Sequence, residues 1–209
     1  DGLRQIRELK LQQARHANPL TLLPGNIPIQ QCLQRLLERQ VDARLCYIDL
    51  DNFKPFNDLY GYGKGDEILL GLAQLLRELC DPRCDFVGHI GGDDFMLVMR
   101  SDDWHARLHQ LDQRFQQLCR TLYRAEHIQA NGFTAPDREG KWRHHDLLNL
   151  SIGVISLPGH QASLYDAARL AELASRAKHD AKKQRGFSVV MQHPGQPLRE
   201  EDAPLNLCN

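Results

Sequence analysis

The chain has 209 residues, of which 42% are hydrophobic and 25% charged, and its formal net charge is −1. These values are typical of one folded domain with a sizeable core, and they exclude a disordered chain. A net charge near zero gives no electrostatic reason to expect a nucleic-acid partner. No apolar run approaches the roughly 18 residues that span a bilayer, so we expect no direct membrane contact.

The cysteines stand mostly in apolar surroundings, where cysteine acts as a small hydrophobic residue. They are Cys32, Cys46, Cys80, Cys84, Cys119 and Cys208. No second Cys or His pair accompanies Cys80 and Cys84, so a metal half-site there is the weaker interpretation. We expect a reduced, cytoplasmic domain. The chain begins at Asp1 without methionine, and we expect it to be a fragment of a longer protein. Attachment of that parent protein to a membrane is compatible with this sequence.

Residues 2–16 contain good helix formers, with Leu3, Ile6 and Leu9 spaced by three. The pattern predicts a short amphipathic helix, and we interpret residues 1–17 as a linker or signalling helix. A frayed terminal tail is the alternative.

The domain itself is predicted over residues 18–192. It opens with a loop punctuated by Pro and Gly, residues 18–26. Asn26 is the predicted N-cap of a helix. The core face of that helix is formed by Ile29, Leu33, Leu36 and Leu37.

Apolar periodicity predicts the central elements. A buried strand covers residues 45–50, a helix covers residues 64–79, and short strands cover residues 86–90 and 95–99. The clearest helix covers residues 103–123, because its apolar residues recur every three or four positions. These are Trp104, Leu108, Leu111, Phe115, Leu118 and Leu122.

Residues 124–146 are polar and contain glycine. Within them we expect two extra strands, residues 128–133 and 141–145, joined around Arg138.

The last elements are a core strand (residues 146–157), an alanine-rich helix (164–184) ending near Gly186, and a strand (187–192). Residues 193–209 are interpreted as a loose C-terminal tail. The order of elements predicts an α+β fold, whose central sheet includes antiparallel strands and has helices mostly on one side.

Two acidic stretches organise the chain. Gly91-Gly92-Asp93-Asp94-Phe95 separates two strand-like runs and predicts a β-hairpin with two carboxylates at its tip. Upstream, the apolar run that begins at Leu45 ends in Asp49 and Asp51, as when a buried strand presents metal ligands at its carboxyl end. Each stretch alone also fits an ordinary acidic turn.

Together with Asn57-Asp58, Gly65-Asp66 and Ser151-Ile152-Gly153, these stretches resemble, in order and spacing, the diguanylate cyclase (GGDEF) domain family. The resemblance covers about residues 18–190. Residues 124–146 resemble the insertion of a subgroup in which the domain accompanies phosphodiesterase (EAL) and CBS modules.

The resemblance implies a palm-like, nucleotide cyclase-like α/β sandwich with a mixed or antiparallel sheet. It also implies an activity: two GTP molecules are condensed into cyclic di-GMP and two pyrophosphates, in bacterial second-messenger signalling. The implied cofactor is Mg²⁺ or Mn²⁺, and the active species is a two-fold homodimer in which each protomer holds one GTP.

Asp49, Asp93 and the backbone carbonyl of Leu50 are the predicted metal ligands, because such hard oxygen donors suit Mg²⁺. Asp51 is a weaker candidate that shares the strand face of Asp49. The catalytic residues that the resemblance implies are Asp93, Asp94 and Lys54.

Asn57 and Asp66 fall on the family's guanine-reading positions. An Asp accepts from guanine N1–H and the 2-amino group, while an Asn amide reads O6 or N3. A helix cap or turn is the alternative role. The candidate phosphate-binding residues are Asn52, Phe53, Lys54, Lys178 and Lys182. Simple solvation is the alternative for a lysine on a helix face.

Two positions depart from the family pattern. Asp94 stands where Glu is usual, and a displacement of ~1 Å near a reacting centre changes rates on the order of a hundredfold. His89 stands where active members commonly carry Arg. Both departures favour the alternative hypothesis, a degenerate GTP-binding module that regulates an attached phosphodiesterase. The guanine-reading pair disfavours a third hypothesis, a different palm-fold nucleotidyltransferase.

The family's inhibitory site is an Arg-x-x-Asp segment just before the hairpin. The segment here is Pro82-Arg83-Cys84-Asp85, in which Asp85 matches, Pro82 stands at the arginine position, and Arg83 is displaced by one. A proline supplies no guanidinium, so we expect product feedback through this site to be absent or weak.

Overall fold

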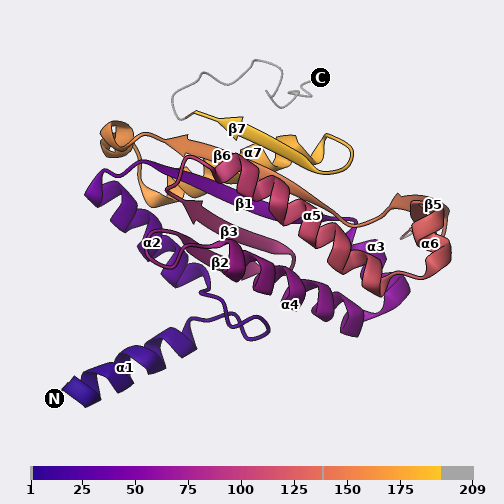
Figure 1. Cartoon of the computed structure of the whole chain (residues 1–209), viewed down its shortest axis with the longest axis horizontal. Helices are drawn as coiled ribbons and strands as arrows, with labels where there is room; N and C mark the ends of the chain where they lie inside the picture. Colours follow the sequence, from indigo (N-terminus) through magenta and orange to yellow (C-terminus); the bar gives the residue numbers. More distant parts are fainter. Residues whose placement is uncertain (1, 138, 194–209) are drawn as a thin grey trace, which may run out of the picture.

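A five-stranded sheet forms the centre of the computed structural model, which describes residues 2–137 and 139–193 (Figure 1). The strand order is β2-β3-β1-β6-β7, antiparallel throughout except for the parallel pair β6 and β7. The strands are β1 (Ala43–Asp51), β2 (Phe86–Gly91), β3 (Asp94–Met99), β6 (Asn149–Leu157) and β7 (Ser188–Gln192). The α+β prediction is confirmed. Apart from His193, the tail predicted over residues 193–209 lies outside the described residues.

Helices cover both faces of this sheet, so the expectation of helices mostly on one side was wrong. They are α2 (Asn26–Arg39), α3 (Phe53–Tyr60), α4 (Tyr62–Leu79), α5 (Trp104–Leu122) and α7 (Ala167–Lys182). Helices α3, α4 and α5 pack on one face, while α2 and α7 pack on the other. The reason is that β1 is apolar on both sides: Ile48 and Leu50 enter the first core, Leu45 and Tyr47 the second.

The polar segment before β6 differs from its prediction. It forms helix α6 (Ala125–Gln129) and a separate two-stranded sheet, β4 (Gly132–Pro136) with β5 (Trp142–Asp146). The strand expected from residue 128 was wrong, because Ile128 lies in α6 and β4 begins only after Asn131, whose φ is 51°. Residue 138, at the expected turn, lies outside the described residues. The core strand also begins later than expected, at Asn149.

Two helix ends differ from their predictions. Gly25, not Asn26, is the N-cap of α2, and no side chain caps it. Glycine is required at residue 25, because a Cβ there would lie 2.6 Å from the carbonyl oxygen of His16. Helix α7 begins at Ala167 rather than residue 164, after the 3₁₀ helix η1 (Gly159–Leu164), because the Asp166 side chain accepts from the N–H of Arg169 at 2.7 Å.

The N-terminal helix α1 (Gly2–Arg15) is confirmed, and it extends away from the sheet (Figure 1). None of its residues is buried, and Leu3, Ile6 and Leu9 are exposed. No helix among the described residues is long and apolar enough to cross a bilayer. The five described cysteines are free thiols.

Candidate functional site

Three carboxylates meet at one end of the sheet. Pairing of β1 with β3 sets Asp49 opposite Asp94, and Asp93 occupies the turn between β2 and β3. One ligand atom from each lies within 4.8 Å of the others. Within residues 2–137 and 139–193, this is the one group of three or more side chains with the geometry of a metal site.

The turn that carries Asp93 depends on glycine. Gly91 and Gly92 have φ values of 153° and 54°, which residues with a Cβ rarely adopt. The ladder between β2 and β3 shifts register between His89 and Gly91, a bulge that turns the tip of the hairpin. The predicted hairpin is therefore confirmed, with Asp94 as the first residue of β3.

The carboxylate cluster holds more negative charge than its surroundings compensate. Burial, a hydrogen bond with Asp49 and the charge of Asp49 raise the pKa of Asp94 to about 6, although Lys178 opposes the shift. Burial and the charge of Asp49 also raise the pKa of Asp93. A cation bound at this point would relieve both effects.

Two lysines of α7 approach the cluster. Lys178 Nζ lies 3.1 Å from Asp49 Oδ2 and 3.4 Å from Asp94 Oδ1, and Lys182 Nζ lies 2.5 Å from Asp49 Oδ1. Burial lowers the pKa of Lys178, but the two carboxylates outweigh burial, and the net shift is upward. Lys178 therefore remains charged beside the acids.

The surroundings of Asp49 Oδ1 show whether the site fits a divalent cation. This oxygen is buried and accepts no hydrogen bond of acceptable geometry, and its close neighbour is the Lys182 ammonium. Buried carboxylate oxygens are normally hydrogen-bonded, and an oxygen left without such a bond is free to ligate a metal. The donor set of hard carboxylate oxygens fits a divalent cation.

Asp51 does not join the cluster. It accepts a hydrogen bond of 2.5 Å from Ser151 Oγ and pairs across the ladder with Asn149. Burial raises the pKa of Asp51, and the Ser151 hydrogen bond opposes the shift. The structure thus separates this weaker candidate from Asp49.

Two residues to which the sequence assigned no function, Gly153 and Tyr47, lie where α7 approaches the sheet. A Cβ on Gly153 would overlap the backbone nitrogen of Lys178, so only glycine lets α7 approach β6 this closely. Lys178 Nζ lies 4.6 Å from the centre of the Tyr47 ring, and burial together with the charge of Asp94 raises the pKa of Tyr47. Strand alternation could have indicated Tyr47, because it shares a face of β1 with Asp49.

The guanine-reading candidates come from two adjacent helices, Asn57 from α3 and Asp66 from α4. A Cβ on Gly65 would overlap Asn57 Oδ1. The Asn57 amide therefore lies against α4 at Gly65, the residue that precedes Asp66. Asn57 Oδ1 is buried without a hydrogen-bond partner, while Asp66 is exposed.

The phosphate candidates divide into two groups. Asn52 has the left-handed conformation (φ 65°, ψ 17°) and precedes α3, and a helix's first N–H groups lack partners within the helix. This turn borders a cavity of about 300 Å³ that Lys182 also lines. Lys54 instead forms an exposed ion pair of 2.7 Å with Asp58 on α3, away from the carboxylates.

The predicted inhibitory segment lies at the opposite end of the sheet. Asp85 accepts hydrogen bonds from the N–H groups of Asp81 (2.9 Å) and Arg100 (3.1 Å), and it pairs with Arg107 at 2.8 Å. Arg83 points elsewhere and pairs with Asp81 at 2.9 Å.

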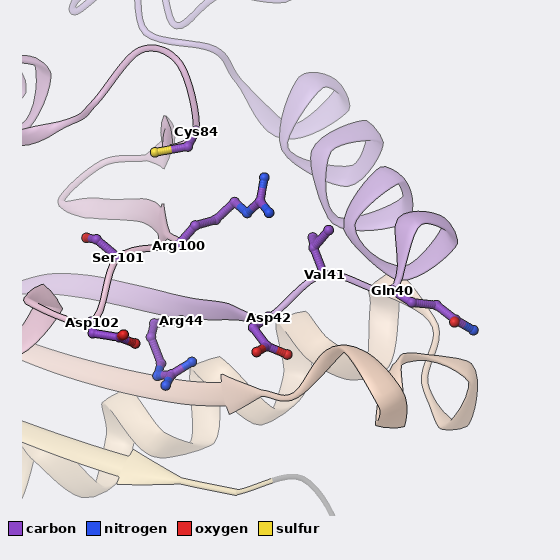
Figure 2. Close-up of a pocket in the computed structure, with 8 residues that line it drawn as sticks. All are labelled: Gln40, Val41, Asp42, Arg44, Cys84, Arg100, Ser101 and Asp102. Atoms are coloured by element: carbon purple, nitrogen blue, oxygen red, sulfur yellow. The ribbon is translucent and has the colours of Figure 1, made fainter.

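Figure 2 shows the cavity beside this segment, of about 670 Å³. The side chain of Arg100 extends toward Val41, while Arg44 lies near Asp42 and Asp102. The lining residues are Gln40, Val41, Asp42, Arg44, Cys84, Arg100, Ser101 and Asp102.

The fold and its cluster define an α+β domain with three carboxylates whose geometry fits a divalent cation. The family model described as "Diguanylate cyclase, GGDEF domain" matches residues 16–186. The chain therefore belongs to the diguanylate cyclase GGDEF domain family.

Curated relatives are similar over part of their length. Diguanylate cyclase DgcP of Escherichia coli is 32% identical over 127 residues, which cover 59% of this chain and 36% of DgcP. Diguanylate cyclase DgcN of the same species is 27% identical over 190 residues, covering 89% of this chain and 41% of DgcN. The chain thus spans less than half the length of either relative.

Solved structures share the fold. The GGDEF domain of YfiN from Pseudomonas aeruginosa is 23% identical, with a TM-score of 0.59 over 84% of this chain and 94% of that one. Diguanylate cyclase SiaD of the same species, solved with its activator SiaC, is 23% identical, with a TM-score of 0.63 over 91% of this chain and 67% of that one.

Proposed function

We propose that this chain is the catalytic domain of a diguanylate cyclase, which condenses two GTP molecules into cyclic di-GMP and two pyrophosphates for bacterial signalling. Residues 18–192 form the catalytic unit, and the α1 region links it to other domains of a longer parent chain. The observation that carries the proposal is the cluster of Asp49, Asp93 and Asp94 beside two lysines of α7. The similarity to DgcP and DgcN supports it.

Asp49, Asp93 and the Leu50 carbonyl hold the metal ion in this proposal. Mg²⁺, or Mn²⁺, supplies charge neutralisation of the triphosphate and polarises the α-phosphorus. Asp94 lies beside these ligands and accepts the proton of the attacking 3′-hydroxyl.

The nucleotide runs from α4 toward α7. The Asp66 carboxylate accepts hydrogen bonds from guanine N1–H and the 2-amino group, and the Asn57 amide nitrogen donates to O6 or N3. The 2-amino group also donates to Asn57 Oδ1, a buried acceptor without a partner in the protein. The N–H groups that follow Asn52 bind phosphate oxygens together with Lys54, whose exposed side chain has room to turn toward them.

Lys178 and Lys182 complete the phosphate site. Both now pair with Asp49. A triphosphate would draw their ammonium groups onto its own oxygens, because the metal then compensates the carboxylates. The two lysines lie on one face of α7, so they can contact the same phosphate chain.

One domain holds one GTP, so a two-fold homodimer is required to place each 3′-hydroxyl against the other α-phosphorus. Because GTP is the substrate, we place the domain in the cytoplasm.

Product formation tests the proposal. The chain, dimerised by a coiled coil fused before α1, is expected to convert GTP and Mg²⁺ into cyclic di-GMP. Asp93→Ala is expected to lower the activity and the Mg²⁺-dependent affinity for GTP by more than about a hundredfold, because a ligand is lost. Asp103→Ala, at an exposed residue before α5, is the control and should keep wild-type activity.

GTP binding without any product would instead support the regulatory alternative. Unchanged Mg²⁺–GTP affinity in Asp93→Ala, measured by calorimetry, would contradict the metal site itself.

A further inference from the structure

His89 is a buried histidine whose two ring nitrogens both have partners. Its exposed fraction is 2%. Nε2 lies 2.9 Å from the carbonyl oxygen of Gly92, and Nδ1 lies 2.8 Å from the hydroxyl of Thr21. A carbonyl only accepts, so Nε2 carries the proton; in the neutral ring, Nδ1 then accepts from the Thr21 hydroxyl.

The ring and the backbone of His89 are both held in place. The ring stacks on Phe95, with centroids 4.1 Å apart and planes 11° apart. The backbone N–H donates to the carbonyl of Pro24 at 2.8 Å. Burial lowers the pKa of His89, in keeping with the neutral tautomer. The hydrogen bond to Gly92 therefore starts from a fixed ring.

The carbonyl that His89 holds belongs to the peptide between Gly92 and Asp93. Gly92 has φ 54°, and as a glycine it could adopt many other conformations. Fixing its carbonyl fixes the plane of that peptide and thus the direction in which Asp93 leaves the turn. His89 accordingly acts on a carboxylate of the cluster without touching it.

Thr21, the partner of His89 Nδ1, lies in a loop that is held by further hydrogen bonds. The Thr21 N–H donates to Asn18 Oδ1 at 3.1 Å, and the guanidinium of Arg77, on α4, donates to the Thr21 carbonyl. This loop directly follows the exposed helix α1. A displacement of α1 would therefore act on this loop, which contains Thr21.

We propose that Thr21 and His89 are positioning residues: through the Thr21 hydroxyl, the His89 ring and the Gly92 carbonyl, they set the orientation of Asp93 and couple it to the loop after α1. The catalytic part of this inference rests on the proposed cyclase function. The tautomer and the local rigidity of the turn do not.

The test uses variants that mimic one ring nitrogen at a time. The amide nitrogen of Gln reaches the place of Nε2, and that of Asn the place of Nδ1. His89→Gln should therefore keep the bond to Gly92, and His89→Asn should lose it. Thr21→Val removes the hydroxyl with little change of shape, and Thr21→Ser restores it.

In the coiled-coil dimer, His89→Asn and Thr21→Val are expected to lower kcat by about tenfold or more, the range in which residues that orient metal ligands act. At saturating Mg²⁺, KM for GTP should change less than kcat, because neither residue contacts the nucleotide and Asp93 is still present. Thr21→Ser should recover most of kcat. His89→Gln should keep more of kcat than His89→Asn, because only Gln keeps the bond to Gly92.

Two measurements decide the inference without activity. Nitrogen-15 NMR of the wild type should show His89 as the Nε2–H tautomer. Hydrogen exchange of the Asp93 amide should accelerate in His89→Asn relative to that of Leu97 in β3 of the same hairpin. An Nδ1–H tautomer, or equal exchange at Asp93 in wild type and His89→Asn, would overturn the inference. If the chain makes no cyclic di-GMP at all, the proposed function fails while these two measurements still stand.

Discussion

Asp49 and Asp85 are both buried carboxylates, but they lie at opposite ends of the same sheet and differ in how their oxygens are used. Their side chains are 5% and 0% exposed. Asp85 accepts two backbone N–H groups and pairs with the largely buried guanidinium of Arg107. The cations that pair with Asp49 are the flexible ends of Lys178 and Lys182, and one of its oxygens accepts no hydrogen bond.

The comparison teaches that burial by itself does not indicate function. A carboxylate whose oxygens are taken by the backbone holds the fold together and has little left to offer a ligand. A carboxylate paired with lysine side chains can release them when a stronger cation arrives. The first pattern describes the predicted inhibitory position, and the second describes the proposed metal site.

The largest expected effect is on stability at the Asp85 end. Asp85→Ala should lower the free energy of unfolding by about 3–5 kcal/mol, because it leaves Arg107 buried without its carboxylate. The matched variant Asp49→Ala should change it by less than about 1 kcal/mol, because Lys178 keeps Asp94 and Lys182 is partly exposed. Urea unfolding of both variants measures the difference, and equal losses would break the comparison.

Asn57 extends the comparison to the guanine site, because its buried Oδ1 also lacks a partner. Asn57→Ala should weaken the preference for GTP over ATP by about 1–3 kcal/mol, the usual effect of removing one partner of a buried hydrogen bond. The change in unfolding free energy should be smaller, since no hydrogen bond within the protein is lost at Oδ1. Calorimetric titration of both nucleotides is the measurement. Equal affinity of the wild type for ATP and GTP would contradict guanine selection.

The smallest expected effect concerns the product. With the nucleotide site filled by a non-hydrolysable GTP analogue, cyclic di-GMP should show no tight binding. The Asp85 oxygens already have partners within the protein, and Arg83 pairs with Asp81. Arg83→Ala should leave the titration unchanged. Tight binding that disappears in Arg83→Ala would show that the segment still forms an inhibitory site.

Local patterns in the sequence determined much of the fold. The strand before Asp49, the glycine hairpin and helices α4 and α5 were all predicted, because each has a strong apolar period or a turn that requires glycine. The shorter elements α3 and α6 were not predicted as helices. Each spans too few residues for a helical period to appear, and their helical state depends on packing.

The tertiary structure alone decided how the site is assembled. The β1–β3 register sets Asp49 opposite Asp94, and the close contact at Gly153 brings Lys178 to both. Partners so far apart in the chain leave no periodic signal. Strand alternation alone therefore proposed both Asp49 and Asp51, and only the family resemblance ranked Asp49 first. Nor did the sequence show that Asp85 is fully hydrogen-bonded, because that depends on the loops after α4 and β3 meeting at one end of the sheet.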